Sequence, residues 1–172
     1  GTRFMLAPNK AFSDITGIAP GEACAKRDLI MDIALSLKKY DIDLFLYYTG
    51  DGPHFDKIAG PAMGLYEDYF AGIHGKVDKN FVENWATVLE EYAVRYGDLV
   101  KGWWVDGCYK TLGYNNELLS IYYNAMKKGN PDVLSAFNSG TASFVSEDGS
   151  DTPIKWYENE GFTCGEDNDF TY

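Results

Sequence analysis

Apolar residues recur at helical spacing in three stretches of the chain. Between Phe81 and Tyr96 they follow the three-to-four-residue period of an amphipathic helix, and Gly97 stands where such a helix ends. Residues 27–40 and 114–128 show the same period. These patterns predict three helices, whereas residues 1–26 and 50–78 are rich in Gly, Pro, Asn and Asp and predict long loops.

Near-continuous apolar runs lie between these helices. They span 43–49, 99–106 and 132–138, and a shorter run at 161–166 follows a polar stretch. Runs of this kind are typical of strands that are covered on both faces. Because strands and helices alternate, the order predicts a parallel sheet with right-handed crossovers.

The predicted fold class is α/β, in the form of a partial TIM (β/α)8-like barrel with about four parallel strands and their helices. A closed eight-stranded barrel needs about 200 residues or more, whereas this chain has 172. We therefore expect residues 1–172 to be a single domain, the central part of a catalytic barrel whose flanking strands are missing. The isolated portion is expected to have an open sheet edge.

Asp106 ends the run Trp103-Trp-Val-Asp-Gly107, at the edge of the sheet where parallel α/β folds bind ligands. Since side chains alternate along a strand, Gly102, Trp104 and Asp106 should share one face. A large indole beside a carboxylate suggests a sugar site. The alternative is that Asp106 caps the next turn.

Other side chains reach the same edge of the sheet. Glu166 ends the last strand, so that it and Asp106 could form the carboxylate pair of a glycosidase, although Glu166 could equally be a solvated residue of an acidic run. Four candidates for substrate binding have structural alternatives: Trp104 and Tyr48 as core residues, His54 as an incidental loop residue, and Asn138 as part of a strand-end turn.

Composition narrows the possible partners. The net charge of −11 argues against nucleic acid and against anionic membrane surfaces, which attract basic patches. Two histidines, and three cysteines without zinc-site spacing, predict no metal site, and no cofactor is expected. No membrane-spanning run is visible. A carbohydrate is the expected partner, and the oligomeric state stays open.

Three segments resemble successive parts of glycoside hydrolase family 29, the α-L-fucosidases. They are Arg27-Asp-Leu-Ile, Leu44-Phe-Leu-Tyr-Tyr-Thr49 and Trp103-Trp-Val-Asp-Gly107. The stretch from Ala7-Pro-Asn9 to Arg27-Asp28 resembles a fucosidase-like sub-branch of gut bacteria. The family's histidine-bearing first two strands and its last two strands are absent from this chain.

The resemblance implies a hydrolase of carbohydrate metabolism, a retaining α-L-fucosidase that removes terminal fucose by double displacement. Asp106 falls on the family's nucleophile, and Glu166 is the expected acid/base, with Glu158 and Glu160 as rivals. The resemblance also implies a bacterial protein of the periplasm or the cell exterior. The alternatives are a non-catalytic carbohydrate-binding protein on the same scaffold and an α/β structural or interaction domain.

Overall fold

The computed structural model describes residues 3–65, 77–109, 112–138 and 161–163. Its strands are β1 (Leu44–Thr49), β2 (Val100–Asp106), β3 (Leu134–Phe137) and β4 (Gly161–Thr163). The helices of the described residues are α1 (Lys10–Thr16), α2 (Pro20–Ala23), α3 (Leu29–Lys38), α4 (Ala59–Met63), α5 (Lys79–Tyr96), the 3₁₀ turn η2 (Gly97–Leu99) and α6 (Asn116–Gly129). None of these described helices is long and apolar enough to cross a membrane.

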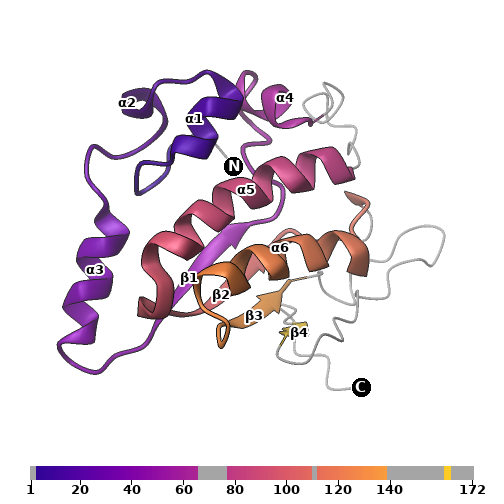
Figure 1. The fold of residues 1–172 in the computed structure, drawn as a ribbon. Coiled ribbons are helices and arrows are strands. Elements are labelled where there is room, and N and C mark those ends of the chain that lie inside the picture. The colour runs from indigo at the N-terminus through magenta and orange to yellow at the C-terminus, as the bar shows by residue number, and fades with distance from the viewer. Residues whose placement is uncertain (1–2, 66–76, 110–111, 139–160, 164–172) are drawn as a thin grey trace.

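The four strands form one parallel sheet in the order β1-β2-β3-β4, so that each strand lies beside its neighbour in the sequence. The helix α5 connects β1 to β2, and α6 connects β2 to β3 (Figure 1). This confirms the predicted α/β class with its parallel strands and connecting helices. Of the last predicted strand, residues 161–163 are in the sheet, whereas residues 164–166 lie outside the described residues.

One face of the sheet packs against α5 and α6 and forms the core. Tyr48, Trp103, Val105 and Phe137 point to this side and are buried. The Tyr48 ring stacks on Trp85 of α5, with 5.0 Å between the ring centroids. Trp103 therefore faces the helices, on the side of the sheet opposite to Trp104.

The opposite face of the sheet is open. Phe45, Tyr47 and Leu134 are 54%, 60% and 42% exposed, and each belongs to the alternate set of strand positions. Gly102 and Trp104 share this face, because Gly102 pairs with Leu134 and Trp104 with Tyr47. The Phe45 ring covers Gly102 so closely that a Cβ there would lie 2.3 Å from the ring.

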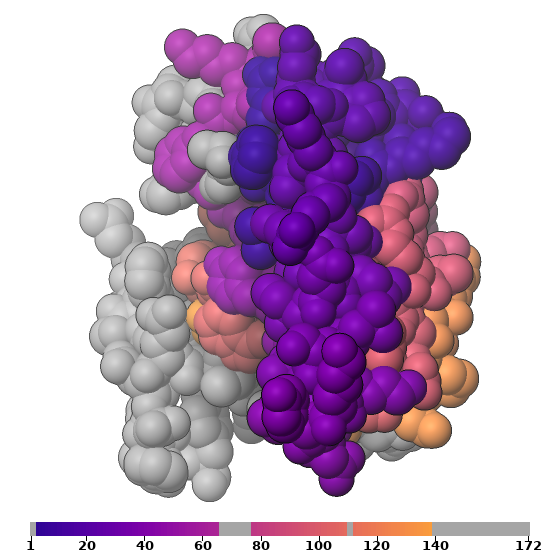
Figure 2. Space-filling view, turned by 90° about the vertical axis from the view of Figure 1, so that its left-hand side faces the viewer, coloured from indigo at the N-terminus to yellow at the C-terminus, as the bar shows by residue number. Residues whose placement is uncertain are grey.

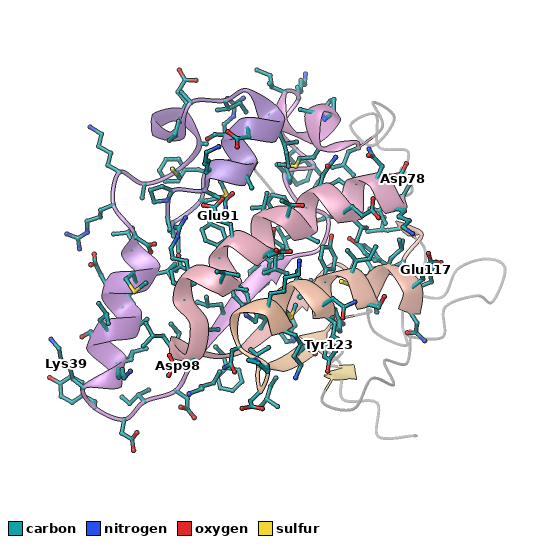
Figure 3. The ribbon with its side chains drawn as sticks, viewed as in Figure 1. Lys39, Asp78, Glu91, Asp98, Glu117 and Tyr123 are labelled. Atoms are coloured by element: carbon teal, nitrogen blue, oxygen red, sulfur yellow. The ribbon has the colours of Figure 1, made fainter. Side chains whose placement is uncertain are left out.

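Helices α5 and α6 run in the same direction and touch at their carboxyl ends (Figure 1). A Cβ at Gly129 would lie 1.9 Å from the Ala93 carbonyl oxygen, so only glycine allows this approach. Ion pairs link the helices at both ends, Lys79 with Glu117 at 3.5 Å and Lys128 with Glu90 at 2.9 Å. The starting end of the pair lies near Asp78 and Glu117 in Figure 3.

The first 26 residues differ from the prediction of an irregular loop, because they contain α1 and α2. Asn9 caps α1 by accepting a hydrogen bond from the Phe12 N–H, and its amide donates to the Val88 carbonyl. The Glu91 carboxylate accepts the Lys10 and Ala11 N–H groups at 2.9 and 2.7 Å. Glu91 faces α1 from the middle of α5 (Figure 3). Contacts distant in sequence therefore hold these short helices.

Helix α3 lies at the β1 side of the molecule, away from α6 (Figures 1 and 2). It begins at the predicted place, where the Asp28 carboxylate caps it by accepting the Met31 N–H at 2.8 Å. Asp28 also receives hydrogen bonds from Arg95 and Tyr96, both at 3.1 Å. The start of α3 is thereby fixed to the end of α5.

Candidate active site

Asp106 lies at the carboxyl end of β2, and three segments of the chain donate hydrogen bonds to its carboxylate. The Tyr47 hydroxyl donates to Oδ2 at 2.8 Å, whereas the Asn138 amide and the Gly107 N–H both donate to Oδ1 at 2.8 Å. An ionised carboxylate can only accept, so a set of donors suits that form. The three donors fix the orientation of the side chain at the edge of the sheet.

Sequence reasoning missed Tyr47 and chose its neighbour Tyr48. The structure places Tyr48 in the core, where it is 7% exposed and donates to the Trp85 carbonyl at 2.8 Å. Tyr47 points the other way because successive side chains alternate along a strand. The pairing of Tyr47 with Trp104, in the register that pairs Thr49 with Asp106, brings its hydroxyl to the carboxylate. The sequence alone does not show this register, because two adjacent tyrosines fit the strand end equally well.

The Tyr47 hydroxyl remains a donor at working pH. Partial burial and the hydrogen bond to Asp106 raise the pKa of Tyr47 above its ordinary value. Its ring lies against Trp104, with 5.5 Å between the centroids and 37° between the planes. Two aromatic side chains thus flank the carboxylate on the open face, where they offer apolar surface to the C–H groups of a sugar.

Asn138 follows β3 and is 1% exposed. Its N–H donates to the Val105 carbonyl at 2.8 Å, and its carbonyl accepts the Cys108 N–H at 3.0 Å. These backbone bonds continue the pairing of β2 and β3 past Asp106. The predicted candidate therefore contacts the candidate carboxylate directly.

His54 lies on the loop after β1 and is paired with Asp51. Its Nδ1 is 2.9 Å from Asp51 Oδ2, and the Thr49 hydroxyl donates to Oδ1 of the same carboxylate. Burial alone would raise the pKa of Asp51, but the hydrogen bonds from His54 and Thr49 outweigh it and lower the pKa below its ordinary value. A Cβ on Gly107 would lie 3.7 Å from Asp51 Oδ1, so the pair lies beside the Asp106–Gly107 turn.

The lowered pKa of Asp51 predicts a pH dependence of stability. A carboxyl group with a lower pKa in the folded than in the unfolded state stabilises the fold above its unfolded pKa, and this contribution is lost as pH falls through the folded value. Asp51→Asn should therefore lower the free energy of unfolding at pH 7. The difference in this free energy between the variant and wild type should shrink as the pH falls below 3.8, the ordinary pKa of an aspartate. Urea titrations between pH 7 and pH 2.5 measure it, and a pH-independent difference would contradict the assignment.

The three acid/base candidates Glu166, Glu158 and Glu160 lie outside the described residues, so their positions relative to Asp106 stay predictions. Over the part of the chain that the structure describes, no group of three His, Cys, Asp or Glu residues could hold a metal ion. The described site consists of Asp106, its three donors, Trp104 and the Asp51–His54 pair.

Glycoside hydrolases use a pair of carboxylates, and the carboxyl edge of a parallel α/β sheet, where Asp106 lies, is a common place for such a site. The model of the family "Endo-alpha(1,4)-fucoidanase Mef1" matches residues 3–170. The chain therefore belongs to the Mef1 endo-α(1,4)-fucoidanase family. No curated protein matches it.

Solved endo-fucoidan hydrolases of glycoside hydrolase family 107 share the fold. MfFcnA9 has a TM-score of 0.57 at 16% identity, over 77% of this chain and 30% of its own. MfFcnA4 has a TM-score of 0.56 at 17% identity, over 77% of this chain and 25% of its own. P5AFcnA has a TM-score of 0.55 at 20% identity, over 84% of this chain and 38% of its own. The chain thus spans between a quarter and two fifths of these proteins.

The expected membership of glycoside hydrolase family 29 is wrong, because the matching family and the solved structures are those of endo-fucoidan hydrolases. The expected removal of terminal fucose, which followed from that membership, is wrong for the same reason. The quoted segments describe a helix start, a strand and a strand-end carboxylate, which place a site on a sheet. Whether a site takes a chain end or a chain interior depends on the loops around it, which those segments leave out.

Proposed function

We propose that this protein hydrolyses α(1,4)-fucosidic bonds inside a fucose polysaccharide, with Asp106 as the nucleophile of a retaining mechanism. The observation that carries the proposal is the orientation of Asp106 by Tyr47, Asn138 and Gly107 at the carboxyl edge of the sheet. Membership of the endo-α(1,4)-fucoidanase family supports the substrate class. We further propose that the sheet is part of a (β/α)8-like barrel.

In this mechanism an oxygen of Asp106 attacks the anomeric carbon, the glycosidic bond breaks, and an acid protonates the departing oxygen. The same group then removes a proton from water, whose oxygen attacks the anomeric carbon, and the bond from that carbon to Asp106 breaks. Glu166 is our proposed acid/base, and a retaining site would place its carboxyl group about 5 to 5.5 Å from that of Asp106. The donors to Asp106 hold its oxygens in one orientation before the substrate arrives.

We propose internal cleavage on the face of the sheet that carries Asp106, supported by membership of the endo-α(1,4)-fucoidanase family. An endo-acting site must let the polysaccharide continue on both sides of the cleaved bond. Tyr47 and Trp104 border Asp106 on this face, and Tyr47 is 60% exposed. We propose that their rings hold sugar units beside the cleaved bond and that His54 is close by for a hydroxyl group. Asn138 is buried and donates to Asp106, so we propose that it acts by orienting that carboxylate.

The test is the size distribution of the products. The full-length protein, incubated with α(1,4)-linked fucan, should produce a ladder of oligosaccharides and an early fall in viscosity. Free fucose as the sole product, or no shortening of the polysaccharide, would refute internal cleavage. Binding without shortening would favour the non-catalytic carbohydrate-binding alternative.

Replacing Tyr47 by phenylalanine should lower kcat about 10- to 150-fold, because a hydrogen bond to a charged group contributes about 1.5–3 kcal/mol and here fixes the attacking oxygen. Initial rates of reducing-end formation measure the effect. The matched control is Tyr40→Phe, since Tyr40 is 74% exposed and follows α3. An equal loss in both variants would show that Tyr47 has no special role.

A further inference from the structure

The backbone N–H and carbonyl groups of Gly50 connect the candidate site to Tyr114 and to α6. Its N–H donates to the Asp106 carbonyl at 2.6 Å. Its carbonyl accepts two phenol hydroxyls, from Tyr114 at 2.5 Å and from Tyr122 at 2.9 Å. The two hydroxyl oxygens are 3.0 Å apart. A backbone carbonyl with two buried tyrosine donors is therefore placed directly behind Asp106.

The packing around Gly50 leaves no space for a side chain. Tyr114 and Tyr122 are 2% and 0% exposed. A Cβ on Gly50 would lie 2.8 Å from the Asp106 carbonyl oxygen and 2.9 Å from Cys108 Sγ. Burial raises the pKa of both tyrosines, so that both hydroxyls keep their protons. The position of Gly50 is thus fixed from two sides by hydrogen bonds and by close packing.

The same turn leads to the second part of the site. Thr49 precedes Gly50, and its carbonyl accepts the Trp85 indole N–H at 2.6 Å. Asp51 follows Gly50 and carries the pair with His54. Side chains of α5 and α6 therefore hold two successive carbonyls at the end of β1, between the backbone of Asp106 and the Asp51 carboxylate.

We propose that Tyr114 and Tyr122 are positioning residues, which set the place of Asp106 relative to the Asp51–His54 pair through the carbonyl of Gly50. This inference rests on the proposed function, since it assigns the two tyrosines a role in the same reaction. Neither hydroxyl touches the substrate. If one hydroxyl is removed, the other can still donate to the Gly50 carbonyl. The loss of a single hydroxyl should therefore have little effect.

The test compares Tyr114→Phe, Tyr122→Phe and the double variant in the full-length protein. Each single variant should lower kcat no more than about threefold, because one donor remains. The double variant should lower kcat about 10- to 100-fold with KM changed less than about twofold, as expected for a misplaced reacting group. Tyr92→Phe is the matched control, since Tyr92 is 8% exposed and donates to the Ala7 carbonyl at 2.7 Å in the N-terminal segment.

Amide hydrogen exchange at Gly50 gives a second measurement that needs no substrate. Loss of both phenol donors should speed exchange of the Gly50 N–H at least about tenfold, whereas Tyr92→Phe should leave it unchanged. Unchanged exchange in the double variant would refute the conclusion that the two tyrosine hydroxyls hold Gly50 in place. Faster exchange with kcat within twofold of wild type, or a loss of kcat equal to that of Tyr92→Phe, would refute their role in positioning. A wild-type protein without hydrolytic activity would refute the proposed function instead.

Discussion

Asp106→Asn should abolish cleavage of α(1,4)-linked fucan, with kcat reduced about 10³- to 10⁶-fold, the range in which loss of a nucleophile acts. An amide oxygen is too weak a nucleophile to attack the anomeric carbon at a useful rate. The fold should persist, because asparagine has nearly the same size and its amide oxygen can still accept the hydrogen bonds from Gly107 and Asn138. Its NH2 group takes the place of Oδ2 and can donate to the Tyr47 hydroxyl, which is able to accept. Single-turnover rates on a defined oligosaccharide measure the loss.

Two comparisons make this test specific. Asp98→Asn is the matched control, because Asp98 is an exposed carboxylate that precedes the opposite end of the same strand (Figure 3). It should retain wild-type rates. Azide should restore cleavage by Asp106→Ala, since a small anion can enter the space that the carboxylate leaves and form a glycosyl azide. Wild-type activity in Asp106→Asn would exclude Asp106 as the nucleophile.

Gly129→Ala should strongly destabilise the fold, since of the glycines assessed in the described part of the chain its added Cβ would make the shortest contact. Its Cβ would lie 1.9 Å from the Ala93 carbonyl oxygen and 2.2 Å from the Ala93 carbonyl carbon, so two helix backbones must separate. We expect the free energy of unfolding to fall by about 3 kcal/mol. Urea denaturation should show a lower midpoint with an unchanged slope.

Gly21→Ala is the control for this substitution. Gly21 lies in the short helix α2, and an added Cβ would meet nothing within 4 Å. We expect a change of less than about 1 kcal/mol, because alanine also reduces the freedom of the unfolded chain. Equal losses in the two variants would mean that the contact of α5 with α6 is not what requires glycine at position 129.

Local pattern predicted the elements around the site well. The helix over residues 81–96 and the strand ending at Asp106 are both present, and Gly102, Trp104 and Asp106 do share a face. These features depend on periodicity and on the alternation of side chains, which a single sequence displays. The carboxylate could therefore be placed at the sheet edge without a structure.

Features that depend on contacts between residues distant in sequence could not be predicted from the sequence alone. The choice between Tyr47 and Tyr48 depends on the register of β1 against β2, and adjacent tyrosines leave that register undetermined. Helix α1 has 7 residues and is held by Glu91, 80 positions after Ala11. The hydrogen bonds from Tyr114 and Tyr122 to the Gly50 carbonyl join residues that are 64 and 72 positions apart. Long-range contacts of this kind leave no periodic signal.

The half-buried indole of Trp104 gives the protein an intrinsic fluorescent reporter at its site. Of the four tryptophans in the sequence, Trp85 and Trp103 are buried at 4% exposure, and a fourth lies outside the described residues. The buried pair senses unfolding, whereas Trp104 senses a change of solvent beside Asp106. A spectral shift without loss of the core signal would thus distinguish occupancy of the site from loss of structure.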